Sequence, residues 1–215
     1  MELAAALLAT LILIATFWLL IARRVRAAIN GYAAQSILLG GLAIAVFAGT
    51  RIPHLLMLGI LTIGIKGFAI PAVIKFQVRA TSYGRREIQY YIGFPTALLA
   101  GAGLTLIGLV AAARIPFVVD HLPEPVLGLA LAVILLGLFT TMARRDAVLQ
   151  LTGLLAAENG LLLVGLVVSP GLGLLIEFAL FLDLLIGVVV MGFLIARMHE
   201  TVSSTDTSEL SRLRG

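Results

Sequence analysis

Three ionisable residues lie inside long apolar stretches of this sequence. Lys66 lies in the apolar run from about 55 to 74, and Glu158 and Asp183 lie near the middle of two later runs. An ionised side chain at the centre of a bilayer costs from about 2.5 to more than 10 kcal/mol, and a lysine at that depth cannot easily reach the interface. We therefore expect the three groups to meet each other, or a thread of water, inside the protein.

Such a trio could move protons. One lysine and two carboxylates can hand a proton along if water connects them, because the protonation of each group depends on the charge of the others. Gln35 and Glu177 could assist this path, although Gln35 could serve only as an interhelical hydrogen-bonding group and Glu177 could simply be hydrated. A different interpretation is that the buried charges only fix helix pairing.

The residues around Lys66 predict an irregular helix. Pro71 has no N–H to donate to the carbonyl of Gly67, so we expect a kink at this proline. Gly64 and Gly67 would let a neighbouring helix, or water, come close to the lysine.

Composition places the chain in a membrane. Of its 215 residues, 61% are hydrophobic and only 12% are charged, whereas a soluble domain is about half apolar and a quarter charged. The net charge of +4 comes from arginines near the ends of apolar runs, which argues against a nucleic-acid partner. There is no cysteine and the three histidines are scattered, so we expect no disulfide, metal or other cofactor in this chain.

The apolar runs predict an all-α, polytopic membrane protein with seven transmembrane helices. In chain order they cover 3–22, 33–49, 54–76, 93–113, 124–142, 147–168 and 172–196. The loops on one predicted side hold twelve basic residues: Arg23, Arg24, Arg26, Lys75, Arg79, Arg85, Arg86, Arg144, Arg145, Arg197, Arg212 and Arg214. The other side holds only Arg51 and Arg114. By the positive-inside rule the N-terminus is outside and the C-terminus is cytoplasmic.

A weak internal repeat divides this single transmembrane domain, residues 1–215. Paired arginines at 23–24 and 144–145 are each followed by a similar segment, Gly31 to Ser36 and Gly153 to Asn159. We interpret this as two three-helix units, 3–76 and 122–197, joined by a helix at 93–113 and followed by a cytoplasmic tail at 198–215. Chance similarity between apolar helices is the alternative. The connection at 77–92 could be a solvated loop or a short interfacial helix.

Several short motifs resemble hydrogenase-4 component E, the small membrane subunit of group 4 [NiFe]-hydrogenase and formate hydrogenlyase complexes. They are Gly31-Tyr32-Ala33-Ala34-Gln35-Ser36, Ile65-Lys66 with Pro71 and Arg79, Arg145, Gln150, Gly153, Glu158-Asn159-Gly160, the segment from Asp183 to Arg197, and Leu213-Arg214-Gly215. The resemblance covers essentially the whole chain.

The C-terminal third, about 145–215, is also similar to the K-type subunit of respiratory complex I and to the C-type subunit of multi-subunit sodium/proton antiporters. Those subunits carry two intramembrane glutamates on a lateral proton path, and by similarity Glu158 and Asp183 would stand for them. Two features depart from that pattern. Glu158 directly precedes Asn159, about a turn later than in the K-type subunit, and Asp183 is one methylene shorter than glutamate.

These resemblances imply a non-catalytic, multi-pass subunit of a redox-driven ion-pumping complex in the cytoplasmic (inner) membrane of a prokaryote. The implied partners are antiporter-like and other membrane subunits, membrane lipid and, indirectly, a peripheral arm with [NiFe] and iron–sulfur centres. Lys66, Glu158 and Asp183 would carry the path, with Gln35 and Glu177 assisting. A subunit of a redox-free sodium/proton antiporter and a purely structural scaffold are the alternatives.

Overall fold

The helical membrane architecture predicted from the sequence is present in the structure. The computed structural model describes residues 2–80, 93–115, 122–123, 125–144, 147–168, 183 and 186–187. Within these ranges the regular structure is entirely helical, and no β-strand is formed. Six helices are long and apolar enough to cross a membrane: Leu3–Ile21, Val25–Thr50, Pro53–Phe76, Phe94–Ala113, Pro125–Ala143 and Val148–Val168. They correspond to the first six predicted spans.

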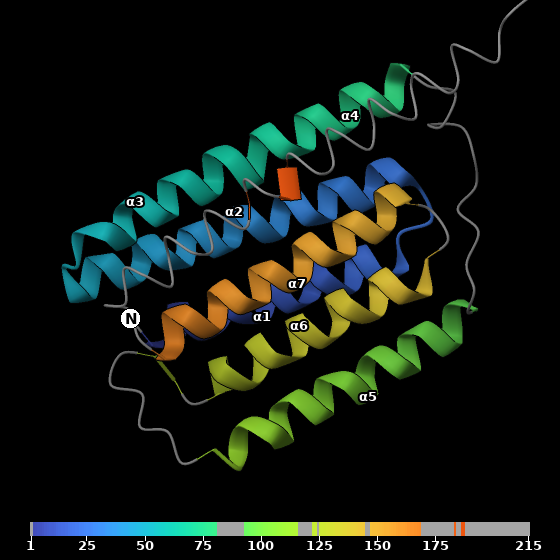
Figure 1. The fold of residues 1–215 in the computed structure, drawn as a ribbon. Coiled ribbons are helices and arrows are strands. Elements are labelled where there is room, and N and C mark those ends of the chain that lie inside the picture. Colours follow the sequence, from blue (N-terminus) through green and yellow to red (C-terminus); the bar gives the residue numbers. More distant parts are fainter. Residues whose placement is uncertain are drawn as a thin grey trace, which may run out of the picture. The chain divides into compact units, whose positions relative to one another are not determined.

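Two compact units make up the chain, Met1–Ala179 and Leu180–Gly215. All the helices labelled in Figure 1 belong to the first unit. In the second unit only Asp183, Ile186 and Gly187 are described, and they are helical. The predicted seventh span and the tail at 198–215 therefore lie almost wholly outside the described residues, as does most of the 77–92 connection.

The first helical hairpin is longer than predicted. Helix α1 (Glu2–Ile21) is joined by residues 22–24 to helix α2 (Val25–Thr50), so the predicted start of the second span near residue 33 is wrong. Ala28 and Ile29 are fully buried although Arg26 and Asn30 beside them are polar. The first two turns of α2 are thus amphipathic, and their apolar face extends the helix beyond its uniformly apolar part.

The third span is one helical segment in three parts. Helix α3 (Pro53–Leu61) continues through the π-helical segment η1 (Thr62–Ala69) into helix α4 (Ile70–Ala80). The turn before it is closed by Arg51, whose backbone is left-handed (φ 59°) and whose N–H donates to the carbonyl of Phe47. Proline at 53 then starts α3, where its missing N–H costs nothing.

The described part of the first unit also contains helices α5 (Phe94–Ala113), α6 (Pro125–Ala143) and α7 (Ala147–Val168). Glycines bring α6 and α7 very close together, because a Cβ placed on Gly137 would overlap the backbone of Ala157. Gly153 would likewise meet Thr141, at 2.6 Å from its Oγ1. This small-residue contact is typical of helices packed within a membrane, and it fixes which face of α7 points inward.

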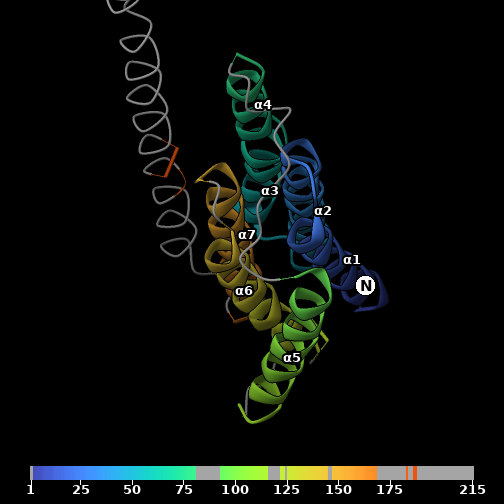
Figure 2. The same ribbon diagram turned by 90° about the vertical axis from the view of Figure 1, so that its right-hand side faces the viewer.

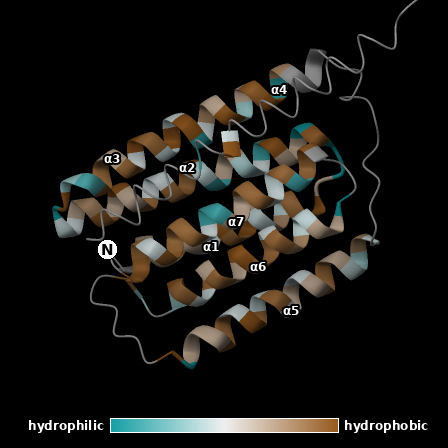
Figure 3. Cartoon of the chain, viewed as in Figure 1, coloured by the Kyte–Doolittle hydropathy of each residue, from teal (hydrophilic) through white to brown (hydrophobic). Residues whose placement is uncertain are grey.

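Figure 1 shows how these helices lie side by side. Helix α2 contacts the α3–η1–α4 segment on one side and α1 and α7 on the other, and α6 packs against α7 and α1. Helix α5 packs mainly on α6 and lies at the edge of the unit (Figure 2). Hydrophobic residues predominate along the helices in Figure 3, but a hydrophilic turn interrupts the middle of α7.

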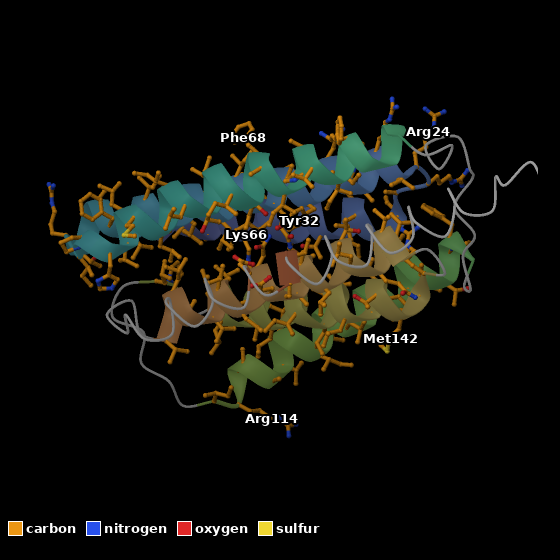
Figure 4. All side chains as sticks on the ribbon, turned by 45° about the horizontal axis from the view of Figure 1, so that its top comes forward. Arg24, Tyr32, Lys66, Phe68, Arg114 and Met142 are labelled. Atoms are coloured by element: carbon orange, nitrogen blue, oxygen red, sulfur yellow. The ribbon has the colours of Figure 1, made fainter. Side chains whose placement is uncertain are left out.

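Basic residues gather at one end of the bundle, which we call the arginine end. It is formed by the turn with Arg23, Arg24 and Arg26, and Arg23 stacks over the ring of Phe94 at 5.7 Å. Arg24 at this end and Arg114 at the other are labelled in Figure 4. The orientation predicted from the basic loops stays a prediction, because several of those loops lie outside the described residues.

The interior differs between the two halves of the bundle. Towards the arginine end, buried polar side chains include Thr16, Tyr32, Thr140, Arg144 and Thr152. Towards the opposite end, the buried side chains that the structure describes beyond Thr62 are apolar. They form one cluster that includes Ala9, Leu42, Leu55, Val126, Val133, Leu163 and Leu166. The level between the halves holds the charged pair of Lys66 and Glu158.

Candidate functional site

Lys66 is carried by the widened helical turns of η1. The N–H of Ile70 donates to the carbonyl of Ile65, five residues back rather than four. Pro71 follows directly and cannot donate to the carbonyl of Gly67, so the wider turn accommodates a donor that is missing by sequence. The irregularity expected at Pro71 thus takes the form of a π-helical segment that holds the lysine. Gly67 packs against Ile37 of α2, whereas Gly64 faces open space.

Lys66 points into the bundle and is 1% exposed. Phe68, two residues later, is 62% exposed and points away from the bundle in Figure 4. Counted along Pro53–Phe76, the lysine therefore lies near the middle of this apolar helical segment.

Lys66 meets Glu158 from the centre of α7. The lysine Nζ lies 3.5 Å from Oε2 of Glu158, and the side chains are only 2% and 5% exposed. Such a pair is retained only where other polar groups compensate for the loss of water, and removing one partner costs roughly 3–5 kcal/mol. Lys66 has a compensating group, because Nζ also donates to Oδ1 of Asn159 at 3.0 Å.

Asn159 joins the pair to a row of hydrogen bonds that crosses to α1. Its Nδ2 donates to Oε1 of Gln35 at 3.1 Å and to Oγ of Ser36 at 2.9 Å. Nε2 of Gln35 then donates to Oγ1 of Thr16 at 2.8 Å. The row ends where Thr16 donates to the carbonyl of Ile12 at 2.8 Å. We call Thr16, Gln35, Ser36 and Asn159 the amide ladder.

The direction of every bond in the amide ladder follows from its two ends. A lysine ammonium can only donate, so Asn159 must present its oxygen to Lys66 and its NH₂ to Gln35. A backbone carbonyl can only accept, so Thr16 must donate to Ile12 and accept from Gln35. The ladder therefore presents oxygen to the cation. Asn159 and Gln35 have no readily titrating proton, so the ladder positions charge rather than transferring it.

The structure brings together three of the predicted path residues: Lys66, Glu158 and Gln35. Asp183 is helical but belongs to the second unit, so its place on a shared path stays a prediction. Glu177 lies outside the described residues.

Sequence reasoning missed two members of the site. Thr16 is one of two threonines in the apolar helix α1, and only its short distance from Gln35 in space reveals its role. Ser36 was noticed only as part of a motif, although it stands four residues after buried Tyr32 on the same face of α2.

Arg144 is a second buried cation with a different task. Sequence analysis placed it in a loop, but it is fully buried. Its guanidinium donates to the carbonyls of Leu19 at 3.1 Å, Leu20 at 2.6 Å and Ala22 at 3.1 Å. These carbonyls end helix α1 and have no partner within it, so Arg144 caps α1 and ties it to the end of α6.

Within the described ranges, no group of three histidine, cysteine or acidic residues is arranged to hold a metal ion. The site itself is a cation–carboxylate pair, closed on one side by oriented amides, at the level where the polar half of the interior meets the apolar half.

In the described residues, the fold and site define a helical bundle with six helices long and apolar enough to cross a membrane, around a buried ion pair. No family model matches the sequence. The chain is similar to an uncharacterized protein of Mycobacterium tuberculosis, Rv0085, with 28% identity over 160 residues that cover 74% of this chain and 73% of that protein. No solved structure matches. These comparisons name no function, so the resemblance to hydrogenase-4 component E stays a prediction.

Proposed function

We propose that this chain is an accessory, non-catalytic membrane subunit of a redox-driven ion-pumping complex of the hydrogenase-4 type. In this proposal Lys66 and Glu158 are its charge-coupling element. The observation that carries the proposal is the 3.5 Å approach of Lys66 Nζ to Glu158 Oε2 near the middle of two spans. A buried pair of opposite charges responds to a third charge nearby, because neutralising one partner destabilises the other.

The polarity of the interior supports a subunit rather than a self-sufficient transporter. Hydroxyl groups reach from the arginine end to the pair, whereas the described interior beyond Thr62 is apolar. In this proposal an ion that reaches Glu158 therefore leaves the bundle laterally, towards a neighbouring subunit, rather than through the apolar half. Asp183, Glu177 and an antiporter-like neighbouring subunit are the proposed next groups, and the arginine end is the proposed cytoplasmic side in a prokaryotic inner membrane.

Gln35 has a positioning role in this proposal. Its Oε1 accepts a hydrogen bond from Nδ2 of Asn159, which orients the Asn159 amide. The amide oxygen of Asn159 then faces the ammonium of Lys66 and accepts its hydrogen bond. Gln35 thus acts on the path through Asn159.

A structural scaffold is the second candidate, favoured by Arg144 and the amide ladder. Both connect α1 to other helices through buried polar groups, and Arg144 does so through the backbone carbonyls at the end of α1. In a scaffold, Lys66 and Glu158 would specify only how η1 meets α7.

The decisive experiment separates assembly from pumping in the intact complex. Lys66→Met and Glu158→Gln remove one charge each, and Lys75→Met is the matched control because this half-buried lysine lies on α4 of the same segment. We expect Lys66→Met and Glu158→Gln to lower ion pumping per assembled complex at least about tenfold, equivalent to about 1.4 kcal/mol, while Lys75→Met pumps normally.

Two outcomes would contradict the proposal. If Lys66→Met and Glu158→Gln reduce the amount of complex but each assembled complex pumps normally, the chain is a scaffold. If both variants assemble and pump normally, the pair has no part in coupling. The proteins that co-purify in mild detergent decide the type of complex: hydrogenase subunits support the proposal, and antiporter subunits alone support the sodium/proton antiporter.

A further inference from the structure

A groove runs between α1 and α2 on the outside of the bundle, away from the ion pair. Its volume is about 350 Å³. It is lined from α1 by Leu11, Ile14, Ala15 and Trp18, and from α2 by Ala27, Asn30, Gly31 and Ala34. Both sets repeat at intervals of three and four residues, so each helix contributes one continuous stripe. At about 1.5 Å per residue the groove is roughly 10 Å long.

The two ends of the groove differ in chemistry. Leu11 and Ala34 form its deep end, in the apolar part of the spans. Trp18 and Asn30 line the end that approaches the turn at residues 22–24, and both are exposed. A tryptophan near the end of a span is typical of the membrane interface.

Basic side chains stand just beyond the polar end of the groove. Arg26 precedes Asn30 by four residues on α2, so the two lie on one face of the helix. Arg23 and Arg24 in the adjoining turn are also exposed. The groove is thus apolar at its deep end and has an amide, a tryptophan and arginines at the other end. This arrangement matches a phospholipid with an anionic headgroup.

We infer that this groove is a binding site for an anionic phospholipid. An acyl chain lies between α1 and α2, and the phosphate lies against Arg26 and Asn30. Basic pockets between membrane helices bind anionic headgroups in this way, because each arginine near the surface attracts the phosphate. Gly31 keeps the groove open, because a Cβ there would stand 3.0 Å from Cδ1 of Trp18. The inference does not depend on the proposed function.

The chain supplies its own probe, because Trp18 is its only tryptophan. The full-length protein is reconstituted in vesicles that contain small fractions of phosphatidylglycerol or phosphatidylcholine with identical brominated acyl chains. Bromine quenches tryptophan fluorescence on contact. We expect brominated phosphatidylglycerol to quench Trp18 at lower mole fractions than brominated phosphatidylcholine.

Three variants assign this preference to the groove. Arg26→Gln should lower the preference for phosphatidylglycerol about fivefold, the factor equivalent to about 1 kcal/mol. Ala34→Leu fills the deep end from an exposed position and should reduce quenching by both brominated lipids. Arg114→Gln is the matched control, because it removes an exposed arginine from the opposite end and should change nothing.

Two results would overturn the inference. Equal quenching by the two lipids, unchanged in Arg26→Gln, would mean that Trp18 meets only bulk lipid. Absence of quenching by either lipid would mean that a protein surface covers the groove.

Discussion

The two halves of the helical bundle bury different kinds of side chain. The half at the arginine end contains a buried guanidinium, three buried threonines and a buried tyrosine, whereas the opposite half is closed by an apolar cluster. The Lys66–Glu158 pair lies at the boundary. Water enters a protein interior only where polar partners hold it. We therefore expect water to reach the Lys66–Glu158 pair from the arginine end.

The halves also use polarity for different purposes. The guanidinium of Arg144 donates to three backbone carbonyls and closes the end of helix α1. Lys66 binds side chains that can themselves change orientation or protonation. Two buried cations in one small bundle thus have different partners, backbone carbonyls for Arg144 and side chains for Lys66.

Among the tests of this comparison, removing the guanidinium of Arg144 should give the largest change, a loss of stability. Arg144→Met leaves the carbonyls of Leu19, Leu20 and Ala22 without their charged donor, which should lower the free energy of unfolding by about 3 kcal/mol or more. Urea unfolding in detergent, followed by circular dichroism, measures the change. Arg24→Met is the control, because Arg24 is exposed. Equal stability of the two variants would show that the cap contributes little.

Water access should give the next largest difference. The sequence has no cysteine, so a single introduced thiol can be followed alone. Thr152 and Leu163 are both fully buried on α7, at opposite sides of Glu158. A hydrophilic thiol reagent should modify Thr152→Cys at least about tenfold faster than Leu163→Cys, equivalent to about 1.4 kcal/mol. Equal modification rates for the two thiols would show that water reaches both halves of the bundle alike.

Exchanging a single hydroxyl should give the smallest effect. Val133 and Thr140 lie on the same face of α6, and Thr140 already donates to the carbonyl of Leu136 at 2.7 Å. Val133→Thr places a hydroxyl in the apolar half and should lower the free energy of unfolding by about 1 kcal/mol. Thr140→Val should change it by less, because only one local hydrogen bond of about 0.5–1 kcal/mol is lost. The reverse order in urea unfolding would contradict the comparison.

The sequence was a good guide to the spans and a poorer guide to their ends. Long apolar runs located six helices, because a bilayer requires a fixed length of apolar residues. The start of α2 was misplaced because Arg26 and Asn30 interrupt the apolar run, although Ala28 and Ile29 still pack inward. The apolar face formed by these two residues is too short to be recognised from sequence periodicity alone. It becomes evident only once the helix that packs against it is known.

By itself, the sequence determined that the chain has several long apolar helices, with Lys66 and Glu158 near the middle of two of them. It did so because hydrocarbon excludes charge, whatever the fold. Only the tertiary structure decided that these two residues meet, that Asn159 presents its oxygen to the lysine, and that Arg144 ends helix α1. Lys66 and Asn159 are 93 positions apart in the sequence, and Arg144 and Leu20 are 124 apart. Helix packing makes these residues partners, and sequence spacing does not encode that packing.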